Sequence, residues 1–385
     1  MLPDIKSLTR DQLVAQLEAW GEKAYRAKQI LDWLYVNQVV SWGEMTNLAK
    51  PLREKLAATF SLLALELVRT QGARDTTQKF LWRLADHAFI ESVLIPASPS
   101  FDGETSDRHT LCVSTQVGCA YGCKFCASGL DGWKRNLLPF EIVEQVMAVE
   151  RLAAKSVQYS VSTVQSDSNP CSASEPNAEQ RKTFSRLVDN VVIMGMGEPM
   201  ANYENLLQAL RILNAGWGGR LGARKITVST SGLAPQIRKF ADEPEQFRLA
   251  VSLHGATDEV RQKIMPVNRK FPLRELTAAL DYYQSKKGKM LLFEYILIAG
   301  VNDSLDQIRP LAALAGKLHA KVNLIPYNAV EGLPWARPDD ETCEAFLVAL
   351  RKHKIVCTLR REKGHDIDAA CGQLRLKTER EMASA

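Results

Sequence analysis

The segment Cys119-Ala-Tyr-Gly-Cys123-Lys-Phe-Cys126 carries three cysteines at C-x3-C-x2-C spacing. Thiolates this close together favour zinc or an iron–sulfur cluster. A four-iron cluster held by three protein ligands keeps one iron open for a small molecule. The alternatives are a structural zinc site with a fourth ligand elsewhere, or cysteines buried as small apolar residues. Zinc sites usually show two C-x2-C pairs, so this triplet favours the cluster.

The composition indicates a globular protein with a large core. The chain has 385 residues, of which 46% are hydrophobic and 24% charged. The net charge of +5 permits a polyanionic partner without requiring one. No apolar run is long enough to span a membrane, and the first residues lack the pattern of a signal peptide. We therefore expect a cytoplasmic location, where cysteines more often bind metal or act in catalysis than form a disulfide framework.

Two regions precede the cysteine segment. Residues 1–60 are predicted to be a helical accessory domain, because Leu13, Leu17 and Trp20 recur at helical spacing. Its interleaved basic residues indicate either a solvated face or a surface that contacts RNA. Residues 61–104 are predicted to form a β extension that includes strands at 79–84 and 88–95.

The region 105–350 alternates between apolar strands and amphipathic helices, which predicts a parallel sheet wrapped by helices. The expected strands are 110–114, 190–194, 225–230, 247–253, 290–298 and 321–326, with helices at 140–154, 204–214, 233–241, 273–286 and 304–318. Six units are fewer than the eight of a closed TIM barrel, so we expect a partial barrel of α/β class. An inserted loop without assigned function is expected at 156–177, and a C-terminal strand and tail at 351–385.

Polar clusters follow several of these strands. They are Gly195–Pro199, Ser229–Gly232, Ser252–Gly255 and Asn328. Each alone would be unremarkable. Ligands gather at the carboxyl ends of parallel strands, so together they predict a cofactor pocket beside the cysteine segment.

Longer motifs resemble one family, the RlmN branch of the RlmN/Cfr radical SAM RNA methyltransferases. These motifs are GEKAYRAKQILDWLY, TLCVSTQVGCAYGCKFCASG, GWKRNL, VIMGMGEPMANYEN, TVSTSG, VSLHGATDEVR, NLIPYN and DIDAACGQL. The likeness covers nearly the whole chain apart from the insertion. It implies a (β/α)6 radical SAM barrel, a [4Fe–4S] cluster and S-adenosyl-L-methionine (SAM) bound at its open iron.

The resemblance also assigns roles to individual residues. Cys119, Cys123 and Cys126 match the cluster ligands. The residues that match SAM contacts are Gly197, Glu198, Ser229, Ser252, Leu253, His254 and Asn328. Cys371 matches the cysteine that is itself methylated, Cys112 the cysteine that later forms a transient disulfide with it, and Glu91 the proton acceptor. The connection from Glu91 to Cys112 is longer than is typical of the family.

The implied reaction methylates carbon 2 of adenosine in the peptidyl transferase centre of 23S rRNA and in tRNA next to the anticodon. It uses one SAM to methylate Cys371 and a second as the radical source. The resemblance further implies an electron donor such as flavodoxin or ferredoxin, and we expect a monomer. Besides the N-terminal helical domain, the candidates for RNA contact are the basic residues of the tail, Arg360, Arg361, Lys363, Arg375 and Lys377. One alternative is a Cfr-type adenine-C8 methyltransferase. Another is a non-catalytic RNA-binding module with a zinc site at Cys112, Cys119, Cys123 and Cys126.

Overall fold

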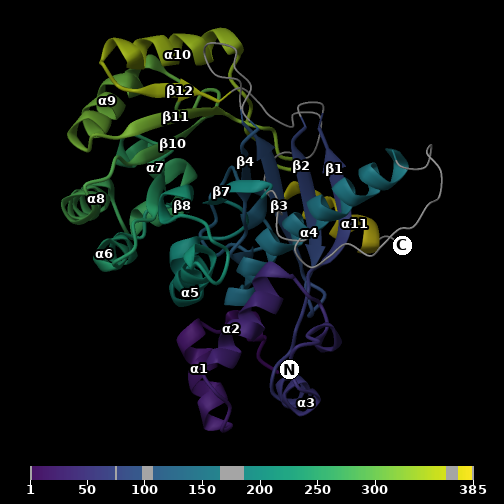
Figure 1. The fold of residues 1–385 in the computed structure, drawn as a ribbon. Helices are drawn as coiled ribbons and strands as arrows, with labels where there is room; N and C mark the ends of the chain where they lie inside the picture. The colour runs from purple at the N-terminus through teal and green to yellow at the C-terminus, as the bar shows by residue number, and fades with distance from the viewer. Residues whose placement is uncertain (1, 74–75, 98–106, 165–185, 361–371, 384–385) are drawn as a thin grey trace.

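A computed structural model describes residues 2–73, 76–97, 107–164, 186–360 and 372–383, with side chains described except at 155–164 and 383. In these parts of the chain, one mixed sheet runs in the order β1-β2-β3-β4-β7-β8-β9-β10-β11-β12 (Figure 1). Its strands are β1 (Glu66–Gly72), β2 (Gln78–Arg83), β3 (Phe89–Pro96), β4 (His109–Cys112), β7 (Val188–Ile193), β8 (Ile226–Thr230), β9 (Arg248–Ser252), β10 (Leu292–Leu297), β11 (Lys321–Pro326) and β12 (Cys357–Leu359). The run from β4 to β12 is parallel, and β1 to β4 are antiparallel.

Helices cover the outer face of the parallel strands (Figure 1). They are α4 (Pro139–Val164), α5 (Tyr203–Asn214), α6 (Ala234–Asp242), α7 (Asp258–Ile264), α8 (Leu273–Lys287), α9 (Ile308–Lys317) and α10 (Asp340–Lys352). Their apolar sides join the strand residues in one large core, as helix-period and strand-period patterns predict. The predicted partial barrel with a helical N-terminal region and a short β extension is confirmed. None of the described helices is long and apolar enough to cross a membrane.

The N-terminal helices are α1 (Arg10–Ala19), α2 (Tyr25–Leu31) and α3 (Lys50–Thr59). Thr9 and Gln12 form a capping box that fixes the start of α1. Leu13 and Leu17, predicted from their spacing, are fully buried. A buried ion pair of 2.7 Å between Lys6 and Glu144 of α4 ties this region to the barrel.

Three features differ from the sequence-based prediction. The expected loop at 156–177 is wrong at its start, because α4 continues to Val164. No glycine or proline interrupts the chain between Pro139 and that residue, so nothing ends the helix earlier. The prediction also missed a hairpin of β5 (Gln116–Gly118) and β6 (Trp133–Asn136), and the C-terminal helix α11 (Gln373–Ala383). These strands are too short to show a period, and α11 begins with leucines two residues apart, Leu374 and Leu376, which is not helical spacing.

Candidate active site

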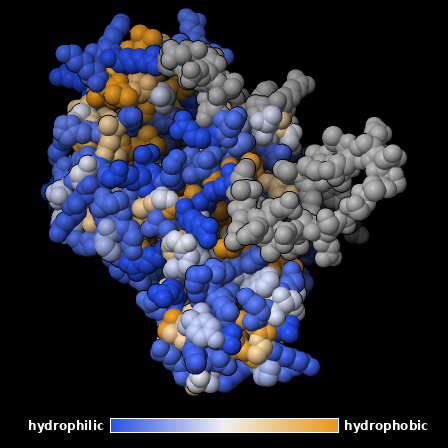
Figure 2. Space-filling view, in the orientation of Figure 1, coloured by the Kyte–Doolittle hydropathy of each residue, from blue (hydrophilic) through white to orange (hydrophobic). Residues whose placement is uncertain are grey.

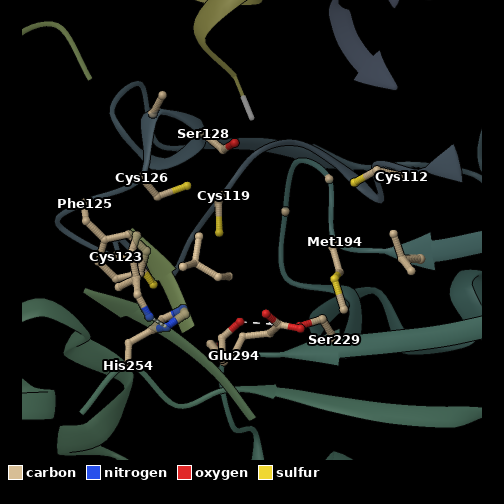
Figure 3. Close-up of a pocket in the computed structure, with 18 of the residues that line it drawn as sticks. Cys112, Cys119, Cys123, Phe125, Cys126, Ser128, Met194, Ser229, His254 and Glu294 are labelled. Carbon is tan, nitrogen blue, oxygen red and sulfur yellow. Dashed lines mark hydrogen bonds between the residues drawn. The ribbon is translucent and has the colours of Figure 1, made fainter. Parts of the chain in front are cut away.

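A cavity of about 350 Å³ lies at the carboxyl ends of the parallel strands. The predicted residues that line it are Cys112, Cys119, Cys123, Cys126, Gly197, Glu198, Ser229, Ser252, His254 and Asn328. Figure 3 shows Cys119 and Cys126 on one side of the space, with His254, Glu294 and Ser229 opposite and Cys112 at the end away from Phe125. Figure 2 shows a mostly hydrophilic surface, with hydrophobic residues in a hollow near the middle of the molecule. The strand-end clusters therefore meet the cysteine segment, as predicted.

The β5–β6 hairpin holds the cysteine segment. The backbone N–H of Cys119 donates to the carbonyl of Gly132 at 3.0 Å, and that of Cys126 donates to the carbonyl of Cys123 at 3.1 Å. Burial raises the pKa of the Cys119 thiol to about 12 and that of Cys123 well above its ordinary value. Without a cation these thiols stay protonated, and metal binding must displace their protons.

The arrangement of thiols bears on the kind of metal group. Among the described residues, no three cysteine, histidine or acidic side chains surround a single ion position. A mononuclear zinc site would need ligands that converge on one ion. A cubane cluster instead takes each cysteine on a different iron, so three thiols spaced around one cavity fit it. Cys119, Cys123 and Cys126 would hold such a cluster here.

Gly197 and Glu198 form the turn after β7. Gly197 has φ +100°, and a β-carbon there would lie 2.5 Å from the β-carbon of Gln116, so only glycine fits. The Glu198 carboxylate accepts the backbone N–H groups of Met200 at 3.0 Å and Ser231 at 2.7 Å. It thus joins the turns that follow β7 and β8. Burial raises the pKa of Glu198, and these two hydrogen bonds oppose that shift.

His254 presents a neutral ring to the cavity. Its Nδ1 accepts the backbone N–H of Ile296 at 3.0 Å, which leaves the proton on Nε2. Burial, and then the nearby Arg261 guanidinium, lower the pKa of His254 to about 3. The ring of Phe125, next to Cys126, meets the His254 ring edge to face at 4.9 Å between centroids. His254 can therefore donate one hydrogen bond to a ligand and does not titrate near neutral pH.

Four predicted SAM contacts remain, and three of them line the cavity. The hydroxyls of Ser229 and Ser252 lie 3.4 Å apart at the ends of β8 and β9. Asn328 lines the cavity after β11. Leu253 is fully buried outside the lining, and its carbonyl accepts from the Arg261 guanidinium at 3.1 Å. Leu253 therefore lies in the core next to the lining residues Ser252 and His254 and not in the lining itself.

The sequence-based prediction missed Glu294, a carboxylate in β10 that lines the cavity. It accepts the side-chain amide of Asn323 at 2.7 Å, and burial raises its pKa. A single charged residue inside the apolar run Leu292–Leu297 was the available signal, because buried carboxylates need a partner or a function.

The residues predicted for radical transfer and RNA contact are only partly described. Cys112 is buried in β4 and faces the cavity. Glu91 is buried in β3 outside the lining, where it meets Lys79 and the start of α11. Cys371, Arg361 and Lys363 lie outside the described residues. Arg375 was wrong as an RNA contact, because it is fully buried and its guanidinium pairs with Asp131 at 3.0 Å.

Two family models and a solved structure match this chain. The family model of the ribosomal RNA large subunit methyltransferase N-terminal domain matches residues 3–62, and that of the radical SAM superfamily matches residues 172–310. A crystal structure of a radical SAM methyltransferase from Sphaerobacter thermophilus superposes with a TM-score of 0.83 at 41% identity, covering 96% of this chain and 98% of that one. The fold and cavity thus define a radical SAM enzyme, a class that uses a [4Fe–4S] cluster and SAM.

Two curated relatives narrow the class to one family. The chain is 52% identical to the probable dual-specificity RNA methyltransferase RlmN 3 of Opitutus terrae, over 98% of this chain and 96% of that protein. It is 47% identical to the probable dual-specificity RNA methyltransferase RlmN of Akkermansia muciniphila, over 99% and 98%. The chain belongs to the RlmN family of RNA methyltransferases. The resemblance drawn from its motifs is confirmed.

Proposed function

We propose that this enzyme methylates carbon 2 of adenosine in 23S rRNA and tRNA through a methylated cysteine. The observation that carries the proposal is the position of Cys112. This fourth thiol lines the same cavity as Cys119, Cys123 and Cys126. A simple cluster site needs no fourth thiol, whereas a covalent mechanism needs one to release its product.

The bound cofactors would supply a carbon radical able to abstract a hydrogen atom. The protein's part begins with the Cys371 thiolate, which takes a methyl group from one SAM by displacing S-adenosylhomocysteine. After hydrogen abstraction, the methylene carbon on that sulfur bonds to the adenine ring. The adduct then gives its ring proton to a base and loses one electron, for which the oxidised cluster would be the acceptor.

Cys112 completes the cycle. Its thiolate attacks the Cys371 sulfur, which forms a disulfide and breaks the bond between sulfur and the methylene carbon. The electron pair of that bond stays with the carbon, which takes a proton to become the methyl group. The disulfide returns to two thiols by two-electron reduction, for which we propose a donor such as flavodoxin or ferredoxin. The position of Cys112 at the end of β4, in the lining of the cavity, supports this role.

RNA must bring one unstacked adenine into the cavity. We propose that Arg360, which borders the cavity, and the exposed basic residues of the N-terminal helices contact the phosphate backbone. Lys23 and Lys28 of that helical region are exposed. Charge reversal at these three positions should weaken RNA binding and reduce its dependence on salt concentration.

The regiochemistry is tested by product analysis. The enzyme is reconstituted anaerobically and given SAM, a reductant and an unmodified 23S rRNA fragment or tRNA, and the nucleosides are identified by mass spectrometry. We expect 2-methyladenosine. A product of 8-methyladenosine would instead assign the C8 reaction, and unmodified RNA with an intact cluster would contradict the proposed substrates.

Cysteine variants test the covalent mechanism. Cys112→Ala should accumulate a covalent protein–RNA adduct, because nothing then breaks the bond to sulfur. Cys371→Ala should give neither adduct nor product. Cys343→Ala is the matched control, since Cys343 is a buried thiol in α10, away from the cavity. Free methylated RNA from either variant at the wild-type rate would refute the two-cysteine scheme.

A further inference from the structure

Glu91 holds the start of the C-terminal helix. Its Oε2 accepts the backbone N–H of Gly372 at 2.7 Å, and its Oε1 accepts that of Arg375 at 2.7 Å. The Lys79 ammonium lies 3.0 Å from Oε2, and both side chains are almost completely buried. The first N–H groups of a helix lack partners within the helix, so a carboxylate there satisfies donors that would otherwise be buried unpaired.

The strand register relates this contact to the cavity. Lys79 pairs with Val93, and Val93 pairs with Cys112, so these residues form one row across β2, β3 and β4. All three line the cavity. Glu91 lies two residues from Val93 along β3, and therefore on the same face of the sheet. The contact between Glu91 and the start of α11 is thus two residues along β3 from Val93, which pairs with Cys112 in the cavity lining.

Other contacts hold the same turn of the chain. Gly372 has φ +89°, and a β-carbon on it would lie 2.9 Å from the backbone nitrogen of Ser128, just after the last cluster cysteine. Leu374 is buried in a small cluster with Leu81 and Phe89. The Arg375 guanidinium pairs with Asp131 at 3.0 Å. The first turn of α11 is therefore fixed between β3 and the cysteine segment.

We propose that Glu91, paired with Lys79, is a positioning residue for the two-cysteine reaction, because it fixes Gly372, which follows Cys371 directly in the sequence. This inference rests on the proposed two-cysteine function. It differs from the proton-acceptor role that the family resemblance implies for Glu91. Three donors occupy its two oxygens, and Glu91 is not among the described residues that line the cavity.

Hydrogen exchange separates the two roles. In the reconstituted enzyme, Glu91→Gln should speed amide exchange in the peptide 372–378 by about tenfold or more, because two backbone hydrogen bonds lose their charged acceptor. A proton acceptor would leave that exchange unchanged. Glu381→Gln is the control, since its carboxylate lies exposed on the same helix and pairs only with Arg69 among the described residues.

Single-turnover chemistry gives the second readout. With SAM alone, intact-mass analysis follows the methyl group that is loaded onto the protein. Glu91→Gln should slow this loading by about tenfold, as loss of positioning requires. With RNA and reductant it should accumulate no covalent adduct, whereas loss of a proton acceptor should trap one, as in Cys112→Ala. Unchanged exchange at 372–378, or an adduct from Glu91→Gln, overturns the proposal.

A second variant covers the case in which Glu91→Gln does not fold. Combining Lys79→Met with Glu91→Leu removes both buried charges, a change that proteins often tolerate. It still removes the acceptor for α11, so the same exchange and loading results are expected. If the wild-type enzyme loads no methyl group, the proposed function fails, and the exchange comparison still decides whether Glu91 holds α11.

Discussion

Gly197→Ala should be the most damaging glycine substitution at the cavity. The new methyl group faces two separate penalties. An alanine at φ +100° costs about 1–3 kcal/mol in backbone strain. Its β-carbon would also lie 2.5 Å from that of Gln116, and forcing such contacts in a packed site costs about 1–3 kcal/mol more. The two together predict a loss of about 4 kcal/mol of unfolding free energy.

Two other glycines separate these penalties. Gly300 has φ +67° with nothing within 4 Å of a built β-carbon, so Gly300→Ala should lose only about 1 kcal/mol. Gly216 has open space and no positive φ, and Gly216→Ala should be neutral or stabilising by about 0.5 kcal/mol. The order of stability should therefore follow the local geometry.

Equilibrium urea unfolding, followed by tryptophan fluorescence, measures the three free energies. SAM binding to the reconstituted enzyme supplies a second measurement, and Gly197→Ala should weaken it at least about tenfold because the turn after β7 must shift. A Gly197→Ala protein as stable as Gly300→Ala would refute the argument. It would mean that Gln116 moves aside at little cost.

Two further predictions concern buried charge. The pKa of His254 is 6.5 in the unfolded chain and about 3 in the folded protein. Between these two pH values the unfolded state binds more protons than the folded state. The free energy of unfolding should therefore fall by about 2 kcal/mol from pH 7 to pH 5. Urea unfolding at both pH values should show this slope in the wild type and lose it in His254→Asn. Lys6→Met should cost roughly 3 kcal/mol by leaving Glu144 short of a buried partner, and the exposed Lys28→Met well under 1 kcal/mol. Equal losses in these two lysine variants would contradict that ranking.

The sequence predicted the barrel well because long apolar strands and helices carry their period openly. It also predicted the strand-end residues, since parallel strands bring their carboxyl ends together wherever the loops run. It could not show that Leu253 turns away from the cavity, because a side chain's direction after a strand end depends on the turn. It also misread Arg375, whose burial depends on Asp131, a partner 244 residues earlier in the chain.

The hydrogen bonds of Glu198 should reduce the entropic cost of binding SAM. The Glu198 carboxylate accepts the backbone N–H groups of Met200 and Ser231, so contacts within the protein join the turns after β7 and β8. Asn302 joins two further segments: its side-chain amide donates to the His254 carbonyl at 2.8 Å and its side-chain oxygen accepts the Ile298 N–H at 2.7 Å. Little chain entropy is then left to lose on binding. Calorimetry on this enzyme should accordingly find only a small entropic cost of ordering the protein when SAM binds.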